Sequence, residues 1–136
     1  MKVLVVDDDA RVRLLLRHTL QDTHRVFEAR DGEEALRQLA LHRPDVVLLD
    51  VEMPILDGLS VCREVRADRA FDRLAIVIVS GSGREVEALD AGADRYVPKP
   101  SRPLRLLSVI DDVIALRQGN VPSGRQGQRP RLRDAG

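Results

Sequence analysis

Short apolar runs alternate with helical repeats along residues 1–116 of the chain. A short apolar run bounded by polar or turn residues is typical of a buried strand, whereas apolar residues spaced three or four apart indicate one face of a helix. The strand-like runs are KVLVV (2–6), RVFEA (25–29), DVVLL (45–49), LAIVIV (74–79) and RYV (95–97). Five strands alternating with five helices predict an α/β fold with a doubly wound parallel sheet.

The helical segments carry their own start signals. Asp31 is expected to cap the second helix, with Glu34 completing a capping box, and Asp57 to cap the third. A short fourth helix is expected around residues 86–89, and the last helix from residue 101 or 103 to about 116. In the first two helices, the expected inward-facing residues are Val12, Leu15, Leu16, Thr19, Leu20, Leu36, Leu39 and Ala40.

Composition narrows the class of protein. A chain of 136 residues with 43% hydrophobic residues fits one domain with a sizeable core, and the 2% of aromatic residues leaves that core to aliphatic side chains. No apolar run reaches the roughly 18 residues that span a bilayer. The apolar run at the N-terminus, which is four residues long and follows Lys2, is too short for a secretory signal. The single cysteine, Cys62, has the spacing of a core residue and fits a reducing cytoplasm.

Charge divides the chain into two parts. Residues 117–136 hold five arginines and one acid, a net of +4, so residues 1–116 carry −4. The last part is rich in Gly, Pro and Gln and has little to bury, which predicts a folded domain over 1–117 and a disordered basic tail over 118–136. The tail is too short for a second domain that binds DNA and lacks aromatic residues to stack on bases, so we expect no direct DNA binding.

The predicted sheet collects polar side chains at one edge. In parallel α/β sheets the ligand site lies beyond the carboxyl ends of the strands. The residues at these ends are Asp7 and Asp8, Asp50, Ser80 and Lys99. Only two of the 22 basic residues are lysines, so a lysine at a strand end indicates a need for a compact ammonium group.

This set of residues suits phosphoryl chemistry. Carboxylates, water and phosphate oxygens are the ligands that Mg²⁺ prefers, and Asp7, Asp8 and Asp50 offer two or three of them. Adding an ammonium and a hydroxyl fits a site that receives a phosphoryl group and neutralises its oxygens. An aspartate can be the nucleophile, and Asp50 lies between the acidic pair and the residues Ser80 and Lys99.

Four motifs, in order, carry a resemblance to a known family. They are VLVVDDD, PDVVLLDVEMPILDG, IVIVSG and AGADRYVPKP. With these motifs, residues 1 to about 117 resemble the receiver domain of bacterial two-component response regulators, in the single-domain form typified by the chemotaxis regulator. The resemblance implies the flavodoxin-like (βα)5 fold with strand order 2-1-3-4-5.

The resemblance also implies a role for each site residue. It implies that Asp50 is the phosphoacceptor and that Lys99, followed by a proline that is usually cis, contacts the phosphoryl group. It implies that the Ser80 hydroxyl also contacts the phosphoryl group, and it makes Ser80 and Tyr96 the switch residues. The implied Mg²⁺ ligands are Asp7, Asp8, Asp50 and the backbone carbonyl of Glu52, whereas Asp9 resembles a helix cap.

A partner set follows from the same resemblance. It implies a sensor histidine kinase as phosphoryl donor and a downstream target or phosphotransfer protein as output. It also implies a cytoplasmic, membrane-free protein that is a phosphoacceptor rather than an enzyme.

Two features depart from the family pattern. The segment from Ser80 to Gly92 is about three residues shorter than in most receivers, which puts the output surface near the fourth helix in doubt. Glu52 places an acid beside the phosphorylation site, and its side chain either touches the metal or a water, or points to solvent.

Other readings of the same residues remain. A haloacid-dehalogenase-like phosphohydrolase also has an acid two residues after its aspartate, as in Asp50 and Glu52, but needs Asp there and leaves VVDDD unexplained. A flavin-binding relative needs a Ser/Thr-rich loop after the first strand, and a P-loop enzyme needs GxxxxGK[ST], which is absent. A pseudo-receiver, a binding module that never takes phosphate, is the remaining alternative.

The last helix predicts a contact between copies of the chain. One set of apolar residues is enough to cover the sheet, and a second set widens the stripe beyond what a surface helix usually needs. We therefore expect a homodimer through this helix. The first set is Leu104, Leu107 and Ile114, and the second is Leu106, Val109, Val113 and Leu116.

Overall fold

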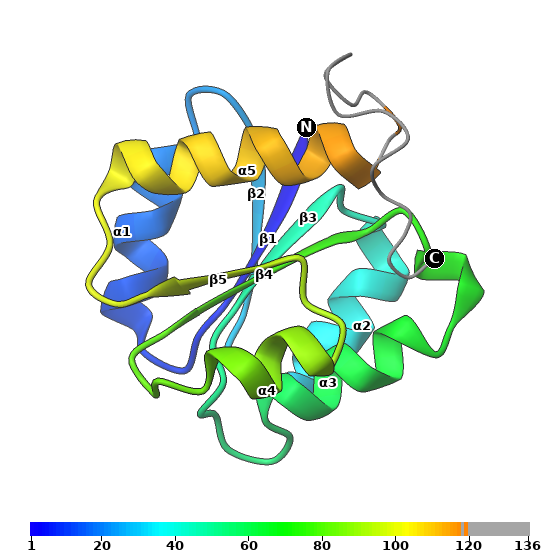
Figure 1. The fold of residues 1–136 in the computed structure, drawn as a ribbon. Helices are drawn as coiled ribbons and strands as arrows, with labels where there is room; N and C mark the ends of the chain where they lie inside the picture. Colours follow the sequence, from blue (N-terminus) through cyan, green and yellow to red (C-terminus); the bar gives the residue numbers. More distant parts are fainter. Residues whose placement is uncertain (118, 120–136) are drawn as a thin grey trace.

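Five parallel strands form the centre of the protein in a computed structural model that describes residues 1–117 and 119. The order β2-β1-β3-β4-β5 confirms the predicted fold, and each strand pairs in parallel with its neighbours (Figure 1). The strands are β1 Lys2–Val6, β2 Arg25–Ala29, β3 Val46–Leu49, β4 Ala75–Ser80 and β5 Arg95–Pro98. The predicted tail, residues 118–136, lies almost entirely outside the described residues.

Helices cover both faces of this sheet. Alternate residues of the central strands point to opposite faces, so each continuous apolar run fills two cores. Helices α1 and α5 cover one face, and α2, α3 and α4 cover the other (Figure 1). The helices are α1 Ala10–Leu20, α2 Gly32–His42, α3 Gly58–Arg66, a 3₁₀ turn Arg69–Phe71, α4 Glu85–Asp90 and α5 Pro103–Arg117. None of the described helices is both long and apolar enough to cross a membrane.

Aspartates begin three of the helices, as predicted. Asp9, Asp31 and Asp57 each accept a hydrogen bond at a carboxylate oxygen from a backbone N–H in the first turn of α1, α2 and α3. The predicted capping box differs in one detail, because Glu34 accepts the N–H of Arg30 rather than that of the cap residue. These caps fix the points at which the chain leaves the strand ends.

Two inward-facing predictions are wrong. Leu15 is 61% exposed and Ala40 is exposed, whereas Leu16, Leu20 and Leu39 are buried. Helix α1 lies against the sheet mainly through the stripe of Leu16 and Leu20, which is narrower than the sequence pattern suggested. Leu15 is thereby left at the surface, on the side that faces the loop between β5 and α5.

The apolar stripes of α5 cover the protein's own core. Val113 is 0% exposed, and Leu106, Val109 and Ile114 are buried as well, because α5 packs on the sheet between its centre and β5. Only Leu104, at 80% exposure, is a large exposed apolar residue of this helix. The second apolar stripe therefore does not face solvent, contrary to the prediction, and a homodimer through α5 stays a prediction without that support.

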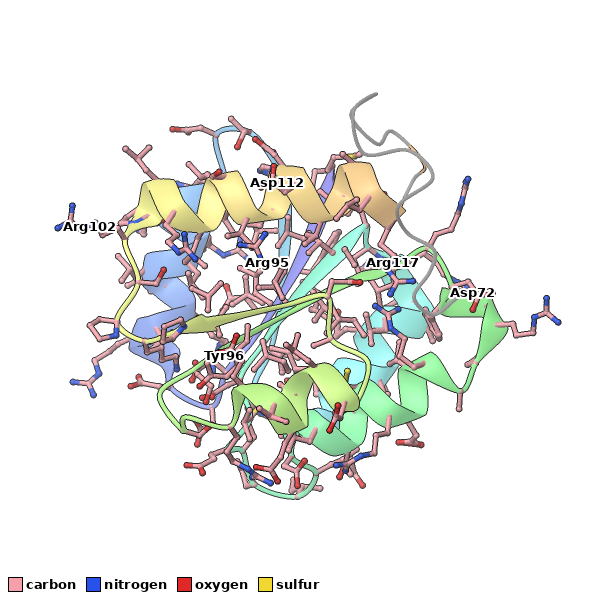
Figure 2. All side chains as sticks on the ribbon, viewed as in Figure 1. Asp72, Arg95, Tyr96, Arg102, Asp112 and Arg117 are labelled. Carbon is pink, nitrogen blue, oxygen red and sulfur yellow. The ribbon has the colours of Figure 1, made fainter. Side chains whose placement is uncertain are left out.

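Partly buried polar contacts hold the N-terminal end of β5. Asp94, just before β5, accepts hydrogen bonds from Arg66 of α3 at 2.9 Å and from Arg117 of α5 at 2.9 Å. Arg117 also donates to the carbonyl of Asp72, beside which it lies in Figure 2. Cys62 is buried in the adjacent core, and burial raises the pKa of its thiol to about 11, which agrees with its prediction as an unreactive core residue.

Candidate functional site

Four neighbouring strands deliver the predicted site residues to one edge of the sheet. Asp7 follows β1, Asp50 follows β3, Ser80 ends β4 and Lys99 follows β5. Because β1, β3, β4 and β5 are consecutive in the sheet, these residues lie side by side although up to 92 positions separate them in sequence. The parallel topology alone explains this convergence.

Three carboxylates meet at this edge. Asp7, Asp8 and Asp50 each place an oxygen within 4.8 Å of the others. Asp7 is only 3% exposed, whereas Asp8 is open to solvent. This donor set of hard oxygens with an open side fits Mg²⁺, which keeps several waters and takes one or two carboxylates.

Lys99 joins two of the acids. Its Nζ donates to Asp7 Oδ2 at 2.6 Å and to Asp50 Oδ2 at 3.2 Å. Burial by itself would lower the pKa of the Lys99 ammonium, but the hydrogen bond to Asp7 and the charges of Asp50 and Asp7 outweigh it, so that pKa is raised. Lys99 therefore stays charged, and the peptide bond to Pro100 is cis.

Backbone contacts hold Asp50 from both sides. Its Oδ1 accepts the N–H of Val51 at 2.7 Å, and its own N–H donates to the carbonyl of Val6 at 3.1 Å. Gly58, the first residue of α3, lies so close that a Cβ there would collide with the Asp50 carbonyl oxygen. The start of α3 thus sets the position of Asp50, a constraint that the sequence did not reveal.

Ser80, the last residue of β4, and Tyr96 of β5 both contact the loop between β4 and α4. The Ser80 hydroxyl is buried, donates to Ser82 Oγ at 3.1 Å and accepts the N–H of Ser82 at 3.2 Å. The Tyr96 hydroxyl donates to the carbonyl of Ser80 at 3.1 Å and accepts the N–H of Gly83 at 2.9 Å. Both predicted switch residues therefore hold the loop between β4 and α4, and Ser82 is a partner that sequence reasoning missed.

Glu52 lies at the rim of the site and is exposed. The hydrogen bond from the Arg84 guanidinium to Glu87 raises the pKa of Arg84, and the charges of Glu87, Asp57 and Glu52 add to this shift. Exposure favours the solvent-facing alternative for this side chain. Helix α4, which follows Arg84, has only six residues.

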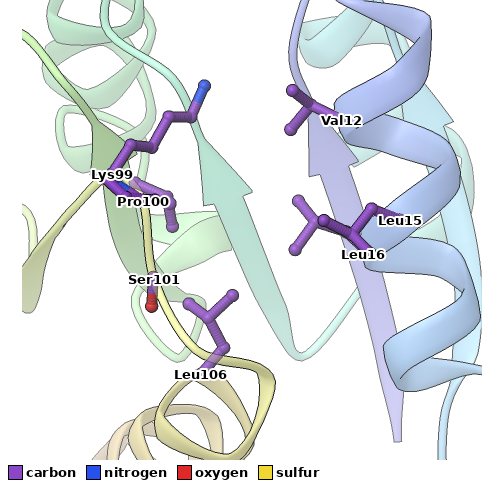
Figure 3. Close-up of a pocket in the computed structure, with 8 residues that line it drawn as sticks. Val12, Leu15, Leu16, Lys99, Pro100, Ser101 and Leu106 are labelled. Atoms are coloured by element: carbon purple, nitrogen blue, oxygen red, sulfur yellow. The ribbon is translucent and has the colours of Figure 1, made fainter.

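An apolar pocket opens beside Lys99. It has a volume of about 390 Å³ and lies between α1 and the loop from β5 to α5 (Figure 3). The Ser101 Oγ is buried and has no hydrogen-bond partner among the described residues. The pocket is lined by Val12, Leu15, Leu16, Val79, Lys99, Pro100, Ser101 and Leu106.

Removing the Asp8 charge is expected to weaken Mg²⁺ binding without harming the fold. Asp8→Asn relieves repulsion among three carboxylates, so without metal its stability should equal that of the wild type or exceed it by up to about 1 kcal/mol. Thermal unfolding with and without Mg²⁺ measures both effects. Asp9→Asn is the matched control, because asparagine also caps a helix and should keep the metal response. A large loss of metal-free stability in Asp8→Asn contradicts the metal assignment and indicates a structural role.

Comparison with known protein families gives a match over most of the described chain. The model of the response regulator receiver domain matches residues 3–111. The response regulator MprA of Mycobacterium avium is 48% identical over 104 residues, which cover 74% of this chain and 45% of that protein. The chain thus spans about half the length of the curated relatives it matches.

Solved structures give the same match at the level of the fold. A response regulator receiver domain protein of Clostridium thermocellum has a TM-score of 0.80 and 28% identity, covering 88% of this chain and 98% of that one. The beryllofluoride-activated receiver domain of DrrB has a TM-score of 0.72 and 30% identity, covering 81% of this chain and 93% of its own. Both are named as receiver domains, and in both cases the match covers nearly the full length of the solved chain.

Proposed function

The chain belongs to the response regulator receiver family, and we propose that it accepts a phosphoryl group from a sensor histidine kinase on Asp50 in a Mg²⁺-dependent reaction. The observation that carries this proposal is the position of the Asp50 carboxylate, which lies in the acidic cluster and is bound by Lys99. In this reading residues 1–117 are the receiver, and phosphorylation changes its contacts with other proteins.

The proposed step moves one phosphoryl group. An Asp50 carboxylate oxygen forms the new P–O bond while the P–N bond to the donor histidine breaks and the imidazole leaves with the electron pair. Asp7 and Asp8, with Asp50 and the Glu52 carbonyl, would hold Mg²⁺, which supplies positive charge to the phosphoryl oxygens. Lys99 Nζ, already directed at Asp50, neutralises another of these oxygens. The chain is a phosphoacceptor in this scheme, not an enzyme that acts on a separate substrate.

The proposed switch uses the loop between β4 and α4. The Ser80 hydroxyl now binds Ser82, and a phosphoryl group on Asp50 would offer it a charged acceptor instead. Because Tyr96 is bound to the same loop at Ser80 and Gly83, a movement of Ser80 would reach Tyr96 and the surface near α4. A downstream target or phosphotransfer protein would read this surface in the cytoplasm.

Two alternatives differ in what they predict. The family match leaves the haloacid-dehalogenase-like reading without support. A pseudo-receiver would bind partners without phosphate, so it predicts no response to a phosphoryl donor.

Incubation with acetyl phosphate, or with beryllofluoride, and Mg²⁺ tests the proposal. Acetyl phosphate should add one phosphoryl group to the protein, as measured by intact mass. Beryllofluoride should change the fluorescence of Tyr96, the only tyrosine in a chain without tryptophan. Neither change should occur when Mg²⁺ is removed with a chelator. A wild-type protein that responds to neither reagent supports the pseudo-receiver.

Lys99→Arg is expected to uncouple the switch from phosphorylation. A planar guanidinium is wider than an ammonium and cannot reproduce the close contacts to Asp7 and Asp50. The variant should still gain mass from acetyl phosphate but lose most of the Tyr96 fluorescence change. Lys2→Arg is the control, because Lys2 bonds the His42 carbonyl at the opposite end of the sheet. A wild-type fluorescence response in Lys99→Arg would show that charge alone suffices.

A further inference from the structure

Arg13 of α1 lies behind the acidic cluster and binds its backbone. Its Nη1 donates to the carbonyl oxygen of Asp7 at 2.7 Å, and its Nε donates to Glu28 Oε1 at 3.0 Å. Only 17% of the Arg13 side chain is exposed. The guanidinium therefore connects the loop after β1 to strand β2.

Glu28 fixes Arg13 in this place. The second oxygen of Glu28 accepts a hydrogen bond from Arg17 Nε at 2.6 Å, and Arg17 also donates to the carbonyl of Val26 at 3.2 Å. Burial would raise the pKa of Glu28, but the hydrogen bonds from Arg17 and Arg13 outweigh it and lower that pKa. Glu28 is thus a charged anchor, and ion pairs of this geometry restrict the arginine fork strongly.

The hydrogen bond from Arg13 to the Asp7 carbonyl affects the position of the Asp8 carboxylate more than that of the Asp7 carboxylate. The Asp7 carboxylate has its own supports, the N–H of Asp9 at 2.9 Å and Lys99 Nζ at 2.6 Å. Among the described residues the exposed Asp8 carboxylate has no hydrogen bond or ion pair. The Asp7 carbonyl and the Asp8 N–H belong to one rigid peptide plane, so fixing that carbonyl fixes the backbone from which Asp8 projects.

We infer that Arg13, held by Glu28, is a positioning residue for the metal site: it orients the Asp7–Asp8 peptide so that the Asp8 carboxylate meets those of Asp7 and Asp50. This inference rests on the proposed metal assignment. Partners that orient ligands in this way typically change metal affinity by 10- to 100-fold when they are removed.

The sign of the effect separates positioning from charge. Arg13 places a positive charge behind a cation site, so its loss should strengthen Mg²⁺ binding if charge alone matters. Loss of orientation acts in the opposite direction. Arg13→Gln should therefore bind Mg²⁺ about tenfold more weakly than the wild type.

Calorimetric or NMR titration of the unphosphorylated full chain with MgCl₂ provides the measurement. Arg17→Gln is the matched control, since it removes the same charge from the same helix and the same Glu28 partner but leaves the Asp7 carbonyl bonded. It should bind Mg²⁺ as the wild type does or slightly more tightly. Arg13→Lys keeps the charge, yet one ammonium replaces the two separate donors, Nε and Nη1, that hold Glu28 and the Asp7 carbonyl in a fixed geometry, so it should also weaken binding.

The outcomes are distinct. A wild-type or tighter Mg²⁺ affinity in Arg13→Gln or Arg13→Lys overturns the inference, as does an equal loss in Arg17→Gln. Arg13→Lys decides the question if the glutamine variant does not fold, which circular dichroism without metal will reveal. A wild-type chain that binds no Mg²⁺ refutes the metal assignment of the proposed function, and this inference with it.

Discussion

Asp50→Asn is expected to abolish phosphorylation while leaving the fold intact. Asparagine lacks the nucleophilic oxygen pair of a carboxylate, so the initial rate of phosphoryl gain from acetyl phosphate should fall at least about 100-fold, or about 2.7 kcal/mol in the activation barrier. The shape is nearly unchanged, and the amide oxygen can still accept the N–H of Val51. Intact mass after incubation with acetyl phosphate and Mg²⁺ measures the loss.

Asp57→Asn is the control for this experiment. Asp57 is a carboxylate in the same loop region and caps α3 through the N–H of Ser60 at 2.8 Å, a role that asparagine fills. Its variant should be phosphorylated like the wild type. Stoichiometric phosphate on Asp50→Asn would mean that another carboxylate is the acceptor and that the proposed role of Asp50 is incorrect.

The sequence was sufficient for the sheet and for the set of residues at its edge. The three central strands, β1, β3 and β4, are almost continuously apolar, which predicts parallel strands buried on both faces, and parallel topology brings every strand end to the same edge. The convergence of Asp7, Asp50 and Lys99 follows from this topology without knowledge of side-chain detail. Their closeness in the structure therefore required no unusual local conformation.

The sequence was not sufficient to predict which apolar residues of a helix are buried, because that depends on how the helix lies on the sheet. Leu15 and Leu16 have equal hydrophobicity, and only the position of α1 on the sheet decides that the first is exposed and the second buried. The same holds for α5, where Val113 of the second apolar set is buried and Leu104 of the first set is exposed, because the helix lies over the interior of one sheet face. Binary patterns record which residues are apolar, not how wide a stripe the neighbouring element covers.

Hydrogen bonds from side chains to backbone carbonyls could not be predicted from the sequence either. Arg13 bonds the carbonyl of Asp7 and Tyr96 bonds that of Ser80, and every residue has a carbonyl, so no residue type announces such a contact. The chain contains many arginines, and Arg13 differs from the others only in its hydrogen-bond partners, which the structure reveals. A glycine is more informative when it begins a helix, where its low propensity needs another reason.

Gly58→Ala is the test of that last point. Alanine favours a helix over glycine by about 1 kcal/mol, so propensity alone predicts a stabilised α3. The structure predicts the opposite, because the new Cβ would collide with the carbonyl oxygen of Asp50, a backbone atom that cannot swing aside. We expect a loss of about 3 kcal/mol in the free energy of unfolding, at the upper end of overpacking effects.

The same collision should also slow phosphorylation. Any relief must move the start of α3 or the Asp50 backbone, and the Asp50 carboxylate is held within a few ångströms of Asp7, Asp8 and Lys99. Gly58→Ala should therefore be phosphorylated more slowly than the wild type at a temperature where both are folded. Gly81→Ala is the matched control, since its nearest neighbour would be Lys99 Cβ at 3.9 Å, an ordinary contact, and its stability should change by less than about 0.5 kcal/mol. Urea unfolding of the three proteins decides between propensity and packing: a Gly58→Ala protein at least as stable as the wild type would show that α3 does not press against Asp50.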